Sequence, residues 1–136
     1  MAEGKVLTGA GLRGQVAGKT ALSTVGKSGA GLTYRGYDVQ DLAENCQFEE
    51  VAYLIFFGEL PTAEQLATYK AKLKSLRQLP QALKEVLERI PADSHPMDVM
   101  RTGVSMLGNI ETEKTFDEQQ DVADRILATW PAIICY

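Results

Sequence analysis

The spacing of apolar residues changes near Asp38 and divides the chain into two kinds of segment. Before it, apolar and polar positions alternate in the short stretches Thr20–Val25 and Leu32–Tyr34, which is typical of strands. After it, apolar positions recur every three or four residues, which predicts helices. We therefore expect a mainly α-helical protein in which a small β-hairpin arm precedes the helices.

The segment between the two predicted strands reads GKSGAG, from Gly26 to Gly31. Glycine tolerates the positive φ angles that tight turns require, so this segment favours a hairpin. A two-stranded hairpin of this length is not stable alone in water. We therefore divide the chain into a β arm with loops at residues 1–36 and a helical part at residues 37–136.

Residues that cap or break helices separate six predicted helices. Thr62 followed by Gln65 is a capping-box pattern, and Pro96 suits the first turn of a helix because that turn needs no donor there. Apolar residues stand on most sides of the second helix, which predicts that it is buried. The predicted helices are Val39–Cys46, Phe48–Gly58, one after Thr62, one from Pro80, one opening at Ser94–His95–Pro96 and one from near Asp117, with a polar connector at Asn109–Phe116 before the last.

Four of these helices carry an apolar stripe, which predicts the buried side of each. The stripes are Leu66, Tyr69, Leu73 and Leu76; Leu83, Val86, Leu87 and Ile90; Met97, Met100, Val104 and Leu107; and Val122, Ala123, Ile126, Leu127 and Trp130. The chain then finishes on the apolar string PAIICY, and such strings usually contact a partner surface. We therefore expect an incomplete fold that belongs to a longer chain.

The charge balance excludes several classes of function. With 14 basic and 18 acidic residues, the chain lacks the basic footprint of nucleic-acid-binding or anionic membrane-surface proteins. No apolar run approaches the roughly 18–20 residues that cross a bilayer, and the N-terminus lacks the layout of a signal peptide. Cys46 and Cys135 lie far apart in apolar contexts, so we expect buried free thiols in a cytoplasmic protein.

Candidate chemistry in the chain is sparse. His95 is the only histidine, and its place before Pro96 favours capping or packing over catalysis, while one histidine without clustered ligands predicts no metal site. The run Gly9–Gly14 matches a dinucleotide fingerprint by letter but lacks the strand and helix that the motif requires. Two GK[ST] triplets, at Gly18 and Gly26, lack the upstream glycine of a phosphate-binding loop.

A basic helix supplies the one candidate binding residue. Lys70, Lys72, Lys74 and Arg77 crowd one helix, and such a surface suits a carboxylate or a CoA phosphate, although solvated lysines are commoner. We take Lys72 as the candidate substrate-binding residue. Arg35 and Arg101 lie in other parts of the chain. An arginine is able to hold a carboxylate, but equally often it ties a loop to helix-terminal carbonyls. We favour the structural role for both.

Three strings in order carry a resemblance to a known family. They are GLTYRGYDVQDLA from Gly31, FEEVAYLIFFGELPT from Phe48 and SHPMDVMRTGVSMLG from Ser94. The chain resembles the citrate synthase family, and through ALSTVGKSG and HPMDVMRTGVS it is most similar to the bacterial 2-methylcitrate synthases. The resemblance implies a predominantly helical enzyme with a large and a small domain, usually a homodimer, of which this chain is the N-terminal part of the large domain.

The resemblance also implies a reaction. Members of the family condense an acyl-CoA, here propionyl-CoA or acetyl-CoA, with oxaloacetate, and they use two histidines and an aspartate as the acid–base groups. No cofactor is implied beyond the CoA thioester, which is a substrate. Because this chain holds one histidine, no catalytic role is carried onto its residues, and we expect the catalytic motifs beyond Tyr136 and the chain itself to be inactive. A citrate synthase that uses acetyl-CoA, or a complete non-catalytic helical assembly module, are the alternatives.

Overall fold

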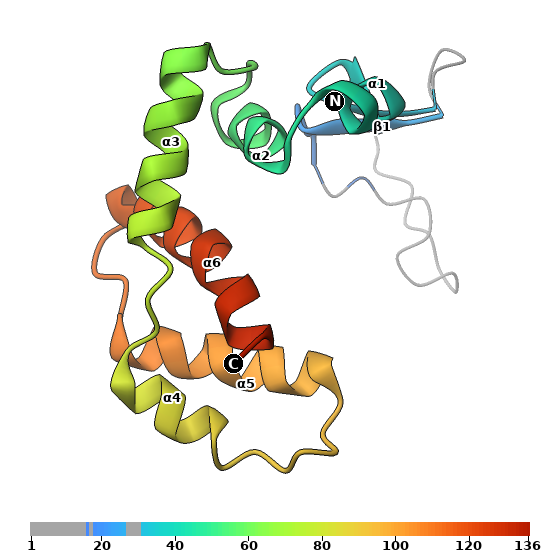
Figure 1. The fold of residues 1–136 in the computed structure, drawn as a ribbon. Helices are drawn as coiled ribbons and strands as arrows, with labels where there is room; N and C mark the ends of the chain where they lie inside the picture. Colours follow the sequence, from blue (N-terminus) through green and yellow to red (C-terminus); the bar gives the residue numbers. More distant parts are fainter. Residues whose placement is uncertain (1–15, 17, 27–30) are drawn as a thin grey trace, which may run out of the picture. The chain divides into compact units, whose positions relative to one another are not determined.

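The computed structural model describes residue 16, residues 18–26 and residues 31–136 of the chain (Figure 1). These residues fall into two compact units, Met1–Cys46 and Gln47–Tyr136. Most of the described chain is helical, as the apolar spacing predicts, and the strands are confined to the first unit.

The first unit contains a three-stranded antiparallel sheet in the order β1 (Ser23–Val25), β2 (Leu32–Tyr34), β3 (Tyr37–Asp38). The predicted pairing of the first two strands is confirmed, with Thr24 opposite Thr33 and their hydroxyl oxygens 2.6 Å apart. The third strand was not predicted, because two residues are too few for an alternation to show. Of the predicted turn between β1 and β2, the structure describes Gly26, at φ 62°, and Gly31.

One short helix, α1 (Val39–Asn45), follows the sheet. Asp38 caps it, since its side chain accepts a hydrogen bond of 2.8 Å from the backbone N–H of Gln40. No helix follows the triplet at Gly18, and β1 comes next in the described chain, so the context of a phosphate-binding loop is missing. The fingerprint-like run Gly9–Gly14 lies outside the described residues.

The second unit is helical throughout. Its elements are α2 (Phe48–Phe57), α3 (Ala63–Ser75), α4 (Gln81–Leu87), α5 (Pro96–Ile110), the 3-10 turn η1 (Phe116–Glu118) and α6 (Gln119–Ile134). Helix α6 packs against both α3 and α5, while α2 packs on α3 and α4 packs on α5 (Figure 1). The polar connector is shorter than predicted because α5 extends to Ile110.

Helix α6 joins two hydrophobic cores. Residues Leu83, Leu87 and Leu107 of α4 and α5 pack with Ile133. Tyr69 and Leu73 of α3 pack with Ala128, with Ala52 and Tyr53 of α2 beside them. The α5–α6 contact is close at Gly103, where a Cβ atom would lie 2.6 Å from the Ile133 side chain. A residue without a side chain is what lets these two helices approach.

Local signals placed most helix ends correctly. The capping box at Thr62 is confirmed: the Gln65 backbone N–H donates to the Thr62 hydroxyl at 3.3 Å, and the Thr62 N–H donates to the Gln65 side chain at 2.8 Å. Helix α2 ends at Gly58, which has a φ of 93° that other residues rarely adopt. Proline 96 begins α5, also as predicted.

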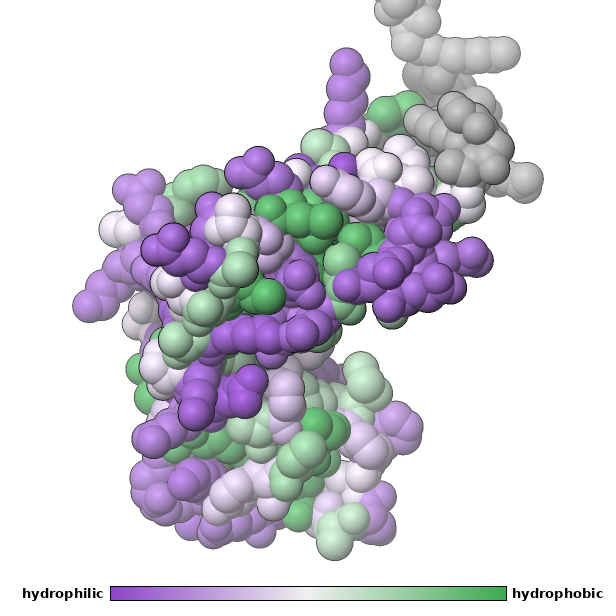
Figure 2. Space-filling view, turned by 45° about the horizontal axis from the view of Figure 1, so that its top comes forward, coloured by the Kyte–Doolittle hydropathy of each residue, from purple (hydrophilic) through white to green (hydrophobic). Residues whose placement is uncertain are grey.

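Several burial predictions are wrong. Phe48, Met97 and Trp130 were placed on buried faces but are 68%, 68% and 51% exposed, and hydrophobic residues are visible among polar ones on the surface in Figure 2. Leu54 is the only fully buried residue of α2, because α2 packs on α3 along one side. The buried thiols are also not found: both cysteines are free, but Cys46 is half-buried and Cys135, at the end of α6, is exposed.

Candidate functional site

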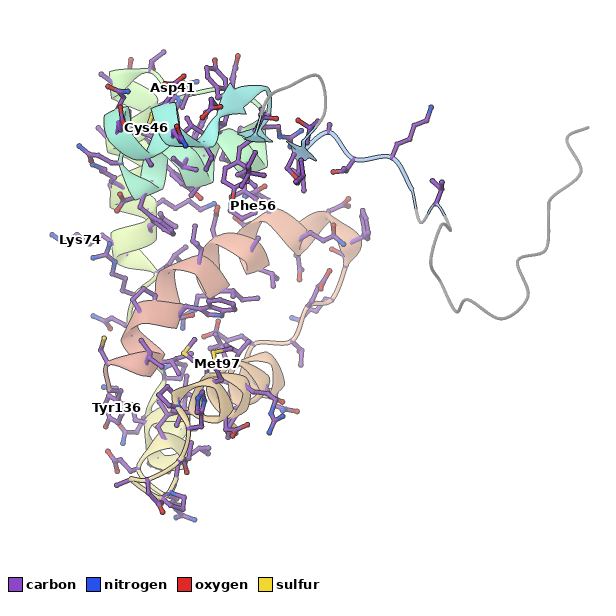
Figure 3. All side chains as sticks on the ribbon, turned by 90° about the vertical axis from the view of Figure 1, so that its right-hand side faces the viewer. Asp41, Cys46, Phe56, Lys74, Met97 and Tyr136 are labelled. Atoms are coloured by element: carbon purple, nitrogen blue, oxygen red, sulfur yellow. The ribbon has the colours of Figure 1, made fainter. Side chains whose placement is uncertain are left out.

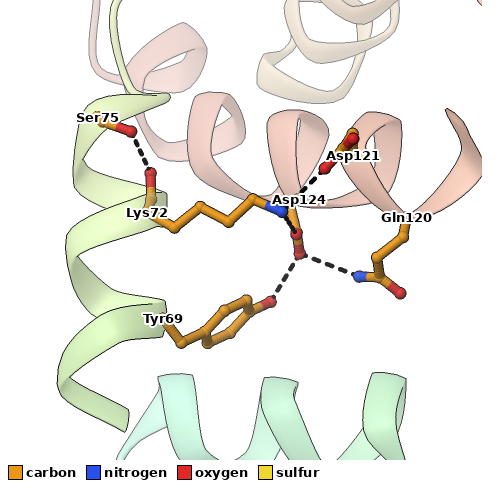
Figure 4. Close-up of polar contacts among 6 residues, drawn as sticks. All are labelled: Tyr69, Lys72, Ser75, Gln120, Asp121 and Asp124. Atoms are coloured by element: carbon orange, nitrogen blue, oxygen red, sulfur yellow. Dashed lines mark hydrogen bonds and ion pairs between the residues drawn. The ribbon is translucent and has the colours of Figure 1, made fainter. Parts of the chain in front are cut away.

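A buried carboxylate on α6 is the centre of a polar site in the interior of the second unit. Asp124 is 0% exposed and accepts hydrogen bonds from three side chains: Lys72 Nζ at 2.6 Å, Tyr69 Oη at 2.9 Å and Gln120 Nε2 at 3.2 Å (Figure 4). Lys72 Nζ also contacts Asp121 Oδ1 at 2.9 Å. We call these five residues the Asp124 network.

Helical spacing explains how the network forms. Tyr69 and Lys72 are three residues apart on α3, and Gln120 and Asp124 are four apart on α6, so each pair lies on one face of its helix. Packing of α3 on α6 brings the two faces together. Tyr69 also packs its ring edge-on against Tyr53 and Phe57 of α2, which fixes the direction of its hydroxyl.

The network shifts two proton equilibria in the same direction. Hydrogen bonds to Asp124 and then to Asp121 raise the pKa of Lys72 above its ordinary value. Burial, followed by the hydrogen bond and charge of Asp124, raises the pKa of Tyr69 far above its ordinary value. At neutral pH Lys72 is therefore an ammonium and Tyr69 a neutral donor, so neither serves as a base or a nucleophile.

The network is internally satisfied. No buried side-chain nitrogen or oxygen among the described residues lacks a hydrogen-bond partner. An ammonium group carries three donors, and two of those on Lys72 go to Asp121 and Asp124, which leaves one. A substrate-binding role for Lys72 stays a prediction, since the observed geometry assigns its charge to two carboxylates of the same chain.

A second polar junction surrounds Arg125. Its guanidinium donates to both carboxylate oxygens of Glu111, at 2.8 and 2.6 Å, and to the backbone carbonyls of Leu76 and Gln78. These bonds tie α6 to the end of α5 and to the segment after α3. The hydrogen bonds from Arg125 lower the pKa of Glu111. Sequence reasoning missed this junction, because nothing in the local pattern links an arginine to an acid 14 positions earlier.

A cavity of about 540 Å³ lies beside this junction, between α5 and α6. Apolar residues form much of its wall, including Leu107, Val122 and Ile126, and acidic side chains Glu118 and Asp121 stand with them. Acidic residues in such a wall repel phosphates and carboxylates. Arg125, which pairs with Glu111, also lines the cavity, so the charges of its wall are mixed and assign no class of substrate.

The remaining candidate residues, His95, Arg101 and Arg35, each have a local setting of their own. His95 caps α5, with its Nδ1 accepting a hydrogen bond of 3.1 Å from the Met97 N–H, which confirms the capping prediction. Arg101 pairs with Asp98 at 2.9 Å within α5, and not with helix-terminal carbonyls. Arg35 is the one described non-glycine residue with a positive φ, 49°, in the turn before β3.

The basic residues of α3, and Arg77 two residues after its end, also contact different partners. Lys70 donates to the Gln47 side chain, Lys72 belongs to the Asp124 network, and Arg77 lies 4.0 Å from Glu49. Across residues 18–26 and 31–136, no three histidine, cysteine or acidic side chains gather as metal ligands would. Nor is any described helix long and apolar enough to pass through a lipid bilayer.

Comparison with known proteins settles the family. The family model described as "Citrate synthase, C-terminal domain" matches residues 11–136. The chain belongs to the citrate synthase family. Among solved structures, citrate synthase from Thermotoga maritima is 29% identical with a TM-score of 0.80, over 93% of this chain and 33% of that one. The mainly helical fold with a small sheet, which the resemblance implied, is thus confirmed.

Curated relatives in the citrate synthase family include several named 2-methylcitrate synthase. The protein of that name from Shewanella oneidensis is 75% identical over 136 residues, which is 100% of this chain and 36% of the relative. "2-methylcitrate synthase 2" of Corynebacterium glutamicum is 46% identical over 91% of this chain and 33% of its own length. The chain thus spans about a third of the length of these relatives. Its place as the N-terminal part of the large domain stays a prediction.

Proposed function

We propose that the protein to which this chain belongs condenses propionyl-CoA with oxaloacetate and water, giving 2-methylcitrate and free CoA. The single observation that carries the proposal is the 75% identity to the Shewanella oneidensis 2-methylcitrate synthase over all 136 residues. The acyl group becomes an alkyl group in this transfer, because its α-carbon forms the new carbon–carbon bond. A solved citrate synthase from Thermoplasma acidophilum, 28% identical with a TM-score of 0.81, is a ternary complex with carboxymethyl coenzyme A and oxaloacetate, which supports this substrate class.

Within that enzyme, this chain supplies helical scaffold. The reaction needs a base for the α-proton and donors for the developing enolate and the ketone. The one histidine of the chain occupies its Nδ1 as a helix cap. We place the acid–base groups outside these 136 residues and propose that the chain alone does not turn over substrate. A cytoplasmic homodimer that needs no cofactor completes the proposal.

Citrate synthesis from acetyl-CoA is the second candidate. "Citrate synthase" of Mycolicibacterium smegmatis is 42% identical over 91% of this chain, and this similarity supports acetyl-CoA as the donor. The support is weaker than the support that the 75% identical Shewanella oneidensis relative gives to propionyl-CoA. No described residue is known to meet the acyl group, so sequence similarity alone ranks the two donors.

The test is release of CoA thiol by the full-length protein that carries this chain. A thiol-reactive dye follows the reaction with oxaloacetate and either propionyl-CoA or acetyl-CoA, with oxaloacetate omitted as the control. We expect a higher kcat/KM with propionyl-CoA and no release by the 136-residue chain. A higher kcat/KM with acetyl-CoA would establish the second candidate, and no release with either donor would favour a non-catalytic assembly module.

The predicted contact of Lys72 with substrate has its own test in the same enzyme. If the remaining donor on Lys72 binds a carboxylate or phosphate, Lys72→Met raises KM for oxaloacetate or acyl-CoA. Asp121→Asn is the matched control, because it weakens the ion pair and keeps the lysine. Unchanged KM values in Lys72→Met, with a lower melting temperature, would leave Lys72 with a purely internal role.

A further inference from the structure

Three lysines on α3 stand in three different environments. Lys70 is half-buried and donates to Gln47, and Lys72 is held by Asp121 and Asp124. Lys74 is exposed, and among the described residues its ammonium makes no ion pair or side-chain hydrogen bond. It projects outward from α3 in Figure 3. Since Lys72 and Lys74 are two residues apart on one helix, they form a matched pair.

These environments matter because the proposed substrate is itself an acylating agent. A thioester transfers its acyl group to a neutral amine: the nitrogen attacks the carbonyl carbon, a C–N bond forms and the C–S bond breaks. CoA leaves as the thiolate and takes up the proton that the nitrogen releases. Only the unprotonated amine reacts, so each lysine reacts in proportion to its free, accessible amine.

Lys72 meets neither condition for this reaction. Its Nζ lies 2.9 Å from Asp121 and 2.6 Å from Asp124, and both carboxylates stabilise the protonated form. Attack would require the nitrogen to break both contacts and to leave Asp124, which is 0% exposed, without its cation. Lys74 has no such partner to release. Its acylation removes one surface charge and breaks no ion pair among the described residues.

We propose that Lys74 is a site of covalent acylation by acyl-CoA thioesters, and that Lys72 is protected from the same reaction by Asp121 and Asp124. The acyl donor comes from the proposed function, but the amide forms without oxaloacetate and without turnover. The enzyme thus carries a modifiable lysine beside one whose modification would break the ion pairs between Lys72 of α3 and the two aspartates of α6.

The experiment measures acyl-lysine formation at each position by mass spectrometry. The full-length protein that carries this chain is incubated with propionyl-CoA at pH 8 without oxaloacetate, once folded and once in urea. The folded rate at each lysine is divided by its unfolded rate. We expect a ratio near one for Lys74 and a ratio about tenfold lower for Lys72, because hydrogen bonds to charged groups must first be broken. Asp121→Asn, at a carboxylate that is 80% exposed, raises the Lys72 ratio and leaves Lys74 unchanged.

Two results would overturn the proposal. Ratios near one at both lysines, within a factor of about two, would show that the carboxylates give no protection. A ratio at Lys74 as low as that at Lys72 would show that Lys74 is not open to the thioester. Neither result bears on CoA release with oxaloacetate, so failure here and failure of the proposed enzyme activity are distinguishable.

Discussion

Lys72→Met is the sharpest test of how α3 is held to α6. Methionine keeps an unbranched apolar stem but removes the ammonium that lies 2.6 Å from the buried Asp124 carboxylate. Removing one partner of a fully buried ion pair costs about 3–5 kcal/mol. The Lys72 side chain is 41% exposed, so water already screens part of that interaction, and Tyr69 and Gln120 still donate to Asp124. We therefore expect a loss of about 2 kcal/mol in the free energy of unfolding.

Urea unfolding of the 136-residue chain, followed by circular dichroism at pH 7, measures this loss. With an m-value of about 2 kcal/mol per molar urea, the midpoint falls by about 1 M. Lys74→Met is the matched control, because it removes a charge from the same helix without a partner, and it should change stability by less than about 0.5 kcal/mol. Equal midpoints for the two variants would refute the claim that the Asp124 network stabilises the α3–α6 contact.

Three further predictions concern the helical unit. Gly103→Ala introduces a Cβ that would lie 2.6 Å from a side-chain carbon of α6, so we expect a loss of about 1–3 kcal/mol in urea unfolding. Gly108→Ala on the same helix meets nothing within 4 Å and should gain up to about 1 kcal/mol, and equal effects of the two would refute the close approach. Stability should fall as pH rises above 10, because the unfolded chain releases protons from tyrosine and lysine at ordinary pKa values of 10.0 and 10.5 while folded Tyr69 and Lys72 keep theirs. Tyr69→Phe should flatten the alkaline part of that curve, and an unchanged slope would contradict the assignment. Glu111→Gln should lower the urea midpoint at pH 7. The effect should shrink as pH falls below 4.5, because a carboxylate with a lowered pKa loses its stabilising contribution as it becomes protonated. A difference that does not depend on pH would argue against the pair with Arg125.

The sequence predicts elements well where a local signal exists. The capping box at Thr62, the proline at the start of α5 and the His95 cap each depend on residues within four positions, and each is confirmed. The stripe Tyr69 and Leu73 is buried as its spacing predicts. These features follow from backbone geometry within one helix, so they need no knowledge of what packs against it.

The buried faces of α6 and the polar site could not be predicted in the same way. The residues buried in α6 are Asp124, Ala128, Thr129 and Ile133, two of them polar, so a stripe drawn through apolar residues points to Trp130 instead. Asp124 is buried because Tyr69 and Lys72 satisfy it from a helix more than 50 positions earlier. Only the tertiary fold reveals such a pairing, since any aspartate on an amphipathic helix suggests exposure.

Helix α6 contacts both hydrophobic cores and is the last helix of the unit to be synthesised, which matters for folding during translation. Helices α2 to α5 leave the ribosome before α6 does, and each of the two cores depends on an α6 residue, Ala128 or Ile133. At about 5–20 residues per second, the 16 residues of α6 take on the order of one to three seconds to make. During that interval α2 already packs on α3 and α4 on α5, but the apolar surfaces of α3 and α5 that α6 covers have no partner within this unit. A chaperone that holds nascent apolar segments would therefore act on this part of the chain before Gln119 has emerged.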